Sequence, residues 1–258
     1  MQLQMTGKWL WRNLAVVLIA ALAVSATSVS QALAADSADR RDAGLAEAES
    51  DPWEPFNSKM FSFNHDVLDR HFLKPVAQGW DFVVPDIVQR SLRNAIDNTN
   101  ALSRVVNSLA QGKMAGAGRE FARFTINSTI GLGGFIDVAK DGFHIEKSDE
   151  DTGQTLGFYG VGSGPYLVLP FLPPTGVRDG IGSVVDAAMN PLNYLIPYAA
   201  QASSATTAGA LTGIAFTDAV NRRSLNLNVY EGVEDSVIDL YGAVRDGYLQ
   251  IRAAKIKE

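Results

Sequence analysis

The sequence predicts an all-α protein with few or no strands. Apolar residues recur every three or four positions in several segments, which is the spacing of one helical face. Prolines and glycines punctuate these segments where helices are expected to begin and end. Extended structure is indicated only by short apolar runs such as residues 166–169. Helices therefore dominate the predicted fold.

The first predicted helix begins near Asp51 and carries an apolar stripe. Asp51 is a candidate N-cap, whereas Pro55 removes an early hydrogen bond and makes Glu54 the alternative first residue. The stripe consists of Trp53, Phe56, Met60, Phe63 and Val67. The residues expected to point away from it are Asn57, Lys59, Ser62 and Asp66. The stripe must face either a core or lipid, because its burial represents on the order of 10 kcal/mol.

Further amphipathic stripes predict helices after Pro85, before Gly112, before Gly131 and over residues 176–188. Gly131 is the predicted C-cap of the third of these helices. Residues 231–258 repeat the spacing, and basic residues gather near their end, where the helix dipole favours them. The apolar residues of the stripes are Ile87, Val88, Leu92 and Ile96; Leu102, Val105, Val106 and Leu109; Met114, Ala117, Phe121 and Phe124; Val177, Ile181, Val184 and Val185; and Val233, Val237, Leu240, Val244, Tyr248 and Ile251.

A long segment in the middle of the chain is almost free of charge. Residues 152–216 contain only three charged side chains, Arg178, Asp179 and Asp186, whereas an average soluble sequence would carry about 16 in the same length. Ten glycines and six prolines interrupt this segment, so it is not one membrane-spanning helix. It is either a buried, glycine-rich core or a surface that meets lipid or another membrane protein, and we favour the surface.

The glycines of this segment do not match a nucleotide-binding loop. Residues 160–164 read GVGSG, which lacks the third glycine of a dinucleotide fingerprint and the lysine of a P-loop. Pro165 and Pro170 frame an extended run after it, whereas a phosphate loop requires a helix N-terminus. A second cluster, GLGGFIDVA at 131–139, follows a helix and is expected to form a helix stop and a tight turn.

No catalytic or metal site is indicated. The chain has three histidines, of which His65 and His71 lie six positions apart and so do not share one helical face. The nearest approach to a nucleophile elbow, around Ser163, has its first glycine misplaced by one position. A hydrolase therefore remains an unsupported alternative. Arg178 and Asp179 stand in the uncharged segment either as first-turn residues of a helix capped by Thr175 or as the lining of a polar passage.

Composition and charge limit the partners. The net charge is −6 and no polybasic cluster is present, which argues against nucleic acid as a partner and against electrostatic attraction to an anionic membrane. Because the chain has no cysteine, it offers no disulfide, thiolate nucleophile, Cys-ligated metal or lipidated cysteine. No cofactor is expected.

Residues 1–34 have the layout of a secretory signal peptide. Lys8 and Arg12 precede an apolar stretch over 14–24, and the segment ends on an A-x-A cleavage site at Ala32, Leu33 and Ala34. The apolar stretch is too short to span a bilayer, which takes about 20 residues. Residues 35–50 are small and charged and predict a flexible linker. We expect export and a single domain over 51–258.

Five runs of the sequence together form a recognisable pattern, namely DPWEPFNSKMFSFNHDVLD, FARFTINSTIGLGGFIDVA, TLGFYGVGSGPYLVLPF, VRDG and DLYGAVRDGYLQIR. In order and spacing these runs resemble the MlaA/VacJ family of outer-membrane phospholipid-transport proteins. The resemblance covers residues 51–186 and resumes near 239, whereas residues 190–235 match poorly. His65 stands where this family commonly has an apolar residue, and the lipidated cysteine usual at its signal cleavage site is missing. Retention at a membrane would then fall to the helices, to a porin or to an uncleaved signal.

The resemblance implies a ring of amphipathic helices that lies in the periplasmic leaflet of the Gram-negative outer membrane, around a polar passage. It implies a non-enzymatic protein that removes misplaced phospholipids from the outer leaflet. The partners implied are phospholipid, a trimeric porin and a periplasmic lipid carrier. The alternatives are a structural porin-binding module and a periplasmic hydrolase.

Two sets of site residues follow from this interpretation. The residues predicted to face lipid are Trp53, Phe56, Met60, Phe63, Phe158, Tyr166, Leu167 and Leu169. The residues predicted to line the passage or to form its turns are Asn57, Asn64, Gly131, Gly133, Gly134, Asp137, Gly160, Gly164, Arg178 and Asp179.

Overall fold

A long helical segment opens the described part of the chain. The computed structural model describes residues 51–199, 201 and 203–257, so the predicted signal peptide (1–34) and linker (35–50) lie outside the described residues. Helix α3 (Glu54–Ser62) continues into the π-helix η1 (Phe63–Leu73) and then into α4 (Lys74–Val83). The first residue is Glu54, the alternative start that Pro55 favours, and Asp51 does not cap the helix. Its carboxylate accepts instead from the backbone N–H of Trp53 and the side chain of Asn57.

Four helices follow along the chain. Helix α5 (Asp86–Thr99) leads into α6 (Ala101–Ala110), and α6 packs along α7 (Met114–Thr129). Helix α8 (Val138–Asp141) is a single turn. The predicted stop after α7 is present, but Gly131 does not adopt a left-handed conformation. The residues with positive φ are Leu132, Gly133 and Gly134. Gly131 is required for close approach, since a Cβ there would lie 2.2 Å from the carbonyl oxygen of Ile136.

The uncharged segment forms both helix and extended chain. Helix α9 (Thr152–Phe158) is followed by the GVGSG turn and a two-stranded antiparallel sheet, β1 (Tyr166–Leu167) and β2 (Thr175–Gly176), in which Tyr166 pairs with Gly176 and Leu167 with Thr175. Helix α10 (Val177–Met189) begins directly after β2. The short strand expected in residues 166–169 is therefore confirmed.

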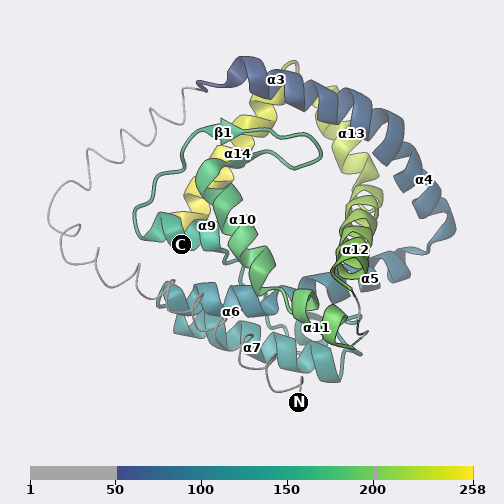
Figure 1. Ribbon diagram of the computed structural model, residues 1–258, viewed down its shortest axis with the longest axis vertical. Coiled ribbons are helices and arrows are strands. Elements are labelled where there is room, and N and C mark those ends of the chain that lie inside the picture. Colours follow the sequence, from purple (N-terminus) through teal and green to yellow (C-terminus); the bar gives the residue numbers. More distant parts are fainter. Residues whose placement is uncertain (1–50, 200, 202, 258) are drawn as a thin grey trace, which may run out of the picture. The chain divides into compact units, whose positions relative to one another are not determined.

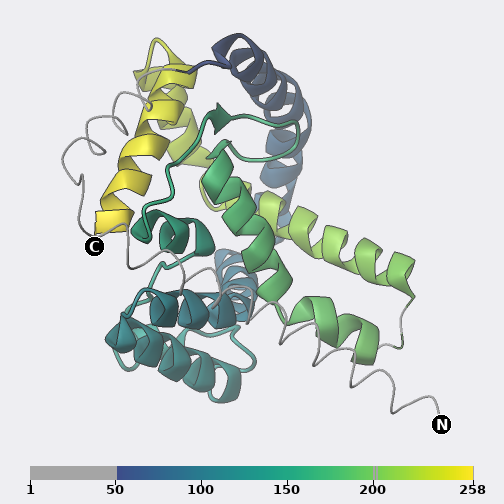
Figure 2. The same ribbon diagram turned by 60° about the vertical axis from the view of Figure 1, so that its left-hand side comes forward.

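Four further helices complete the described chain. They are α11 (Leu192–Ala199), α12 (Ser204–Ser224), α13 (Leu227–Ser236) and α14 (Leu240–Lys257), and α11 lies against α12 (Figure 2). The apolar spacing of residues 231–258 suggested continuity, but the backbone is extended at Val237 (φ −121°, ψ 142°), which divides the tail into two helices.

Within residues 47–258, one compact unit, the contacts between elements close a circuit (Figure 1). Helix α4 packs on α12, α12 on α5, α5 on α6, α6 on α9, and α9 on α10. The segment before α10 returns to α3, because Asn57 hydrogen-bonds the backbone of β1. The predicted ring-like, all-helical fold class is thus confirmed. No helix among the described residues is long and apolar enough to cross a membrane.

Candidate functional site

The polarity of the fold is inverted. Seven apolar side chains are buried in the described residues, and most are small, whereas eighteen buried side chains are polar or charged. Asn57, Gln89, Ser108, Glu120 and Asn221 are completely buried. A water-soluble domain shows the opposite arrangement, in which charged residues are almost never fully buried unless paired. Hydrogen bonds and ion pairs, not apolar contacts, therefore hold the helices together.

The apolar side chains lie on the outside. Phe82 is 92% exposed, Tyr198 84%, Phe171 77%, Ile87 74% and Val184 71%. The predicted stripes of α5, α6, α7 and α10 all contain such exposed residues, including Leu102, Leu109, Met114, Phe121, Phe124 and Ile181. Monomeric soluble proteins rarely expose contiguous apolar patches of more than a few hundred Å². The sequence correctly predicts the stripes, and the structure turns them outward.

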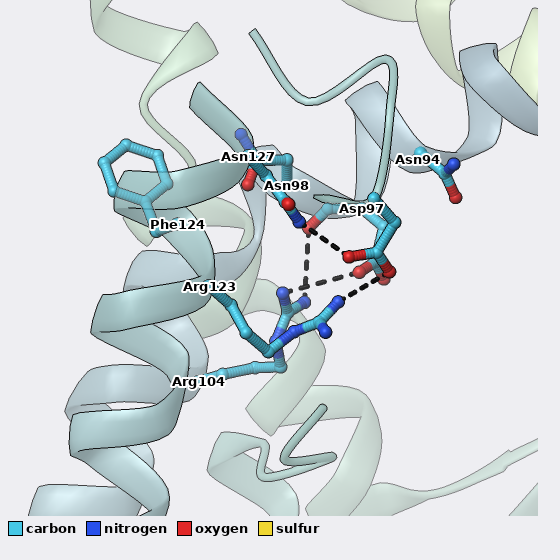
Figure 3. Close-up of a pocket in the computed structure, with 8 residues that line it drawn as sticks. Asn94, Asp97, Asn98, Arg104, Arg123, Phe124 and Asn127 are labelled. Carbon is cyan, nitrogen blue, oxygen red and sulfur yellow. Dashed lines mark hydrogen bonds and ion pairs between the residues drawn. The ribbon is translucent and has the colours of Figure 1, made fainter. Parts of the chain in front are cut away.

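An ion-pair network joins α6 and α7. Arg104 is paired with Glu120 (Nε to Oε2, 2.5 Å) and Asp97 (Nη2 to Oδ2, 3.4 Å). The other oxygen of Glu120 accepts from the backbone N–H of Ser148 at 2.6 Å. Figure 3 shows Arg104 and Arg123 pointing into one small polar pocket of about 10 Å³. Arg104, Arg123 and Glu120 are buried, so their charges require partners, whereas Asp97 is partly exposed.

Asp137 belongs to the same pocket and was one of the residues predicted for a turn. It accepts from Arg123 (2.8 Å) and Asn127 (2.9 Å), and it caps α8 through the backbone N–H of Lys140. Burial raises the pKa of Asp137, but these hydrogen bonds outweigh it and hold the pKa below its ordinary value. The turn that follows α7 is thus fixed by a carboxylate as well as by its glycines.

A second network joins α9, α10 and α14. Asp179 accepts from Arg178 (2.8 Å), Tyr248 (2.5 Å) and Arg252 (2.8 Å), and Arg252 also forms a two-pronged pair with Asp151 at 2.5 and 2.9 Å. Burial opposes ionisation of Asp151 and Asp179, yet the hydrogen bonds from Arg252 prevail and the pKa of each is lowered. This network fastens the C-terminal helix to the middle of the chain.

The prediction that Arg178 and Asp179 line an open passage is therefore not supported. Each is only 6% exposed, and both sit inside the junction of the three helices. The alternative prediction is half right. Asp179 lies in the first turn of α10, but Gly176 occupies the N-cap position and no side chain caps the helix.

Two of the predicted residues hold the 166–171 segment. Asn57 donates to the carbonyl oxygen of Tyr166 and accepts from the backbone N–H of Val168 at 2.9 Å. Asn64, in the π-helix η1, donates to the carbonyl oxygen of Leu169 (2.8 Å) and accepts from the backbone N–H of Phe171 (3.0 Å). Asn57, which was expected to point away from the apolar stripe of α3, is completely buried against this segment.

The residues predicted to face lipid divide into three groups. Trp53, Phe56 and Phe158 are between 44% and 49% exposed. Met60, Phe63, Leu167 and Leu169 are half-buried. Tyr166 is 4% exposed, because its ring packs against those of Tyr241 and Tyr248, so its assignment to the lipid-facing set is corrected. The predicted turn glycines Gly133, Gly134, Gly160 and Gly164 all have positive φ.

A cavity of about 550 Å³ is lined by both apolar and charged side chains. Its apolar side chains include Leu192 of α11 and Leu211, Ile214 and Ala215 of α12. Its six acidic and two basic side chains come from α5, α6, α10, α12 and the segment before α9, and they are Asp97, Asp149, Glu150, Asp151, Asp186, Asp218, Arg104 and Lys147. Such a cavity suits an amphiphile, whose polar and apolar parts require different surroundings.

Sequence reasoning missed this cavity. Asp186 was noted only as one of three charges in the uncharged segment, and Asp97, Arg104 and Lys147 were not singled out. A charged residue on an otherwise apolar helix is the signal that could have identified Asp186. No group of three or more potential metal ligands is assembled among the described residues.

Comparisons with known proteins agree with one another. Residues 49–255 match the family model described as MlaA lipoprotein. The chain is 34% identical over 222 residues to the Intermembrane phospholipid transport system lipoprotein MlaA of Haemophilus influenzae, covering 86% of this chain and 85% of that protein. It is 38% identical over 148 residues to the protein of the same name from Escherichia coli (strain K12), covering 57% and 59%.

A solved structure also resembles this fold. It is described as "Structural basis for maintenance of bacterial outer membrane lipid asymmetry" and superposes with a TM-score of 0.69 at 31% sequence identity. The match covers 80% of this chain and 99% of the solved chain.

Proposed function

Because the chain belongs to the MlaA lipoprotein family, we propose that it is a phospholipid-translocating component of the outer membrane. It removes misplaced phospholipids from the outer leaflet and passes them to a soluble periplasmic carrier, which maintains the lipid asymmetry of that membrane. The names of the related proteins from Haemophilus influenzae and Escherichia coli support this assignment.

The observation that carries the proposal is the inverted polarity. Exposed Phe, Ile and Val side chains such as Phe82, Ile87 and Val184 find a favourable solvent in acyl chains, at roughly 25 cal/mol for each Å² removed from water. The helices then lie along one leaflet as amphipathic interfacial elements. Signal-directed export through residues 1–34 and retention on the periplasmic side of the membrane complete the proposal.

The cavity lined by both charged and apolar side chains supports movement of lipid through the protein. A phospholipid headgroup slides along the charged side chains around Asp97 and Asp186, while its acyl chains stay against Leu211, Ile214 and the lipid outside. This task requires positioning and solvation only, with no covalent chemistry. A trimeric porin and the soluble carrier are the partners that we propose alongside phospholipid.

A deletion strain tests the function. We expect phospholipid to accumulate in the outer leaflet and the barrier to detergent to weaken, and both defects to be reversed by the full chain. A structural porin-binding module predicts normal outer-leaflet phospholipid in the same strain, and that result would overturn the proposal. A hydrolase predicts instead that lysophospholipid or free fatty acid appears when the purified protein meets phospholipid vesicles.

A further inference from the structure

Asp186 differs from the other acidic side chains that line the 550 Å³ cavity. Within the described residues, each of the other five has a cation within ion-pair distance. The pairs are Asp97 with Arg104 and Lys147, Asp149 with Lys147 and Lys255, Glu150 with Lys113, Asp151 with Arg252, and Asp218 with Arg222. The donors to Asp186 in the same residues are all neutral. Its negative charge is therefore not cancelled by an ion pair.

The hydrogen bonds to Asp186 are unevenly divided between its two oxygens. Oδ1 accepts from the hydroxyls of Ser103 and Thr152, both at 2.6 Å, and from the amide of Asn107 at 3.0 Å. Among the described residues, Oδ2 accepts only from the backbone N–H of Thr152 (3.1 Å), which also approaches Oδ1 at 3.3 Å. A carboxylate has about four lone-pair sites shared by two oxygens. Oδ2 thus retains acceptor capacity, and the side chain is already fixed in place by its neighbours.

The position of Asp186 suits one end of an amphiphile. It belongs to α10 and lines the same cavity as the apolar side chains Leu211 and Ile214 of α12. Lys147, which is paired with Asp97 and Asp149, also lines the cavity, and its side chain is 35% exposed, so a phosphate can approach its ammonium. A ligand that satisfies all three features carries a cationic amine, a phosphate and a hydrocarbon part.

We propose that Asp186 makes this cavity selective for phospholipids whose headgroup bears a cationic amine, such as phosphatidylethanolamine, over lipids with a purely anionic headgroup. The inference rests on the proposed function. The ammonium donates to Oδ2 of Asp186, the phosphate lies near Lys147, and the acyl chains lie on the apolar side chains of α11 and α12. A purely anionic headgroup leaves the charge of Asp186 uncompensated and is disfavoured.

Competition between two lipids tests the inference. The full chain in detergent is incubated with equal amounts of phosphatidylethanolamine and phosphatidylglycerol of identical acyl chains, and the retained lipid is measured by mass spectrometry. We expect the amine lipid to be enriched about fivefold, the value of one ammonium–carboxylate pair in a partly hydrated site. In Asp186→Asn the enrichment falls to near unity, whereas in the control Asp246→Asn, which removes an exposed acid of α14, it is unchanged.

A lipid variant keeps the test independent of protein folding. N-acetylated phosphatidylethanolamine has no cationic amine, so the unmodified protein should lose its preference for it over phosphatidylglycerol. Equal retention of all three lipids by the unmodified protein would overturn the selectivity but leave the proposed function intact. Retention of no phospholipid at all would overturn the proposed function, and the inference would fall with it.

Discussion

The side-chain amide of Asn57 donates a 2.8 Å hydrogen bond to the carbonyl oxygen of Tyr166, 109 residues further along the chain. The same amide group accepts from the backbone N–H of Val168. This fully buried side chain thus satisfies the carbonyl oxygen of Tyr166 and the N–H of Val168. It joins α3 to the loop before α10.

Replacing Asn57 is expected to destabilise the fold. Asn57→Ala leaves a buried carbonyl and a buried N–H without partners, which costs about 2–6 kcal/mol at roughly 1–3 kcal/mol for each group. Thermal unfolding in detergent, followed by circular dichroism, measures the loss. Asn228→Ala, at an exposed site of α13, serves as the control and should change stability by less than about 0.5 kcal/mol. Equal stability of the two variants would contradict the role given to Asn57.

The junction of α9, α10 and α14 should depend on Arg252. Arg252→Gln leaves Asp151 without its ion-pair partner and Asp179 with one fewer. Breaking the buried pair with Asp179 costs up to about 3–5 kcal/mol, whereas the pair with Asp151, which is 35% exposed, adds less because solvent screens it. Some of that cost is avoided because Asp179 retains Arg178 and Tyr248. Urea unfolding measures the change. Lys257→Gln, at the exposed end of the same helix, is the matched control, and a loss as large as that of Arg252→Gln would refute this assignment.

Acid should loosen this junction and also the pocket around Asp137. The pKa values of Asp137, Asp151 and Asp179 are lowered in the folded protein, so their ionised forms stabilise the fold. That contribution is complete above the ordinary carboxylate pKa of about 3.9 and disappears as the pH falls through the folded values. Urea unfolding at a series of pH values should show a flat region above about pH 5 and a decline below pH 4. In Asp151→Asn the decline should be smaller, and an unchanged decline would count against this origin.

The turn after α7 distinguishes two costs of a glycine substitution. Gly133→Ala meets no neighbouring atom and pays only for its φ of +75°, about 1 kcal/mol. Gly134→Ala, at φ +99°, also places a Cβ 2.6 Å from that of Asn98 and should cost at least about 2 kcal/mol more. Gly118→Ala, exposed within α7, should stabilise by about 0.5–1 kcal/mol. Thermal unfolding that ranks the three in another order would contradict this account.

Membrane contact should depend on exposed aromatic residues. Phe82→Ser removes about 2 kcal/mol of apolar transfer free energy and should lower partition into phospholipid vesicles by roughly thirtyfold. Stability in detergent should be kept, because Phe82 is 92% exposed and makes few packing contacts. Phe82→Leu retains the apolar surface and should partition almost as the parent does. Vesicle flotation at limiting lipid measures both. If serine and leucine partition alike, this part of α4 does not enter the bilayer.

The sequence predicted where helices form but not which face of each is buried. A spacing of three and four identifies two faces, and the usual expectation places the apolar one inside. On α3 the reverse holds, since Asn57 is buried while Trp53 and Phe56 are about half exposed. Whether the apolar face of a helix points inward or outward depends on whether water or lipid surrounds the protein, and the apolar spacing does not indicate which. The uncharged middle segment was the one sequence feature that pointed to lipid.

Contacts between residues far apart in the sequence explain the remaining differences between the predicted and the observed fold. Arg104 and Glu120 lie on separate helices, and nothing in the spacing of either helix indicates that they meet. The π-helical conformation of residues 63–73 and the extended backbone at Val237 likewise depend on tertiary packing. The family resemblance predicted the ring-like arrangement, whereas the burial of Tyr166, Arg178 and Asp179 is seen only in the structure.

An interior of buried polar groups changes the thermal behaviour of the protein. Ordinary domains show a heat-capacity increase on unfolding of about 12–15 cal/mol/K per residue, because unfolding wets apolar surface and the polar surface exposed with it offsets only part of the gain. Here the newly wetted groups include Gln89, Glu120 and Asn221, whose hydration lowers the heat capacity. The heat-capacity increase on unfolding should therefore be unusually small, and the free energy of unfolding should change only gradually with temperature.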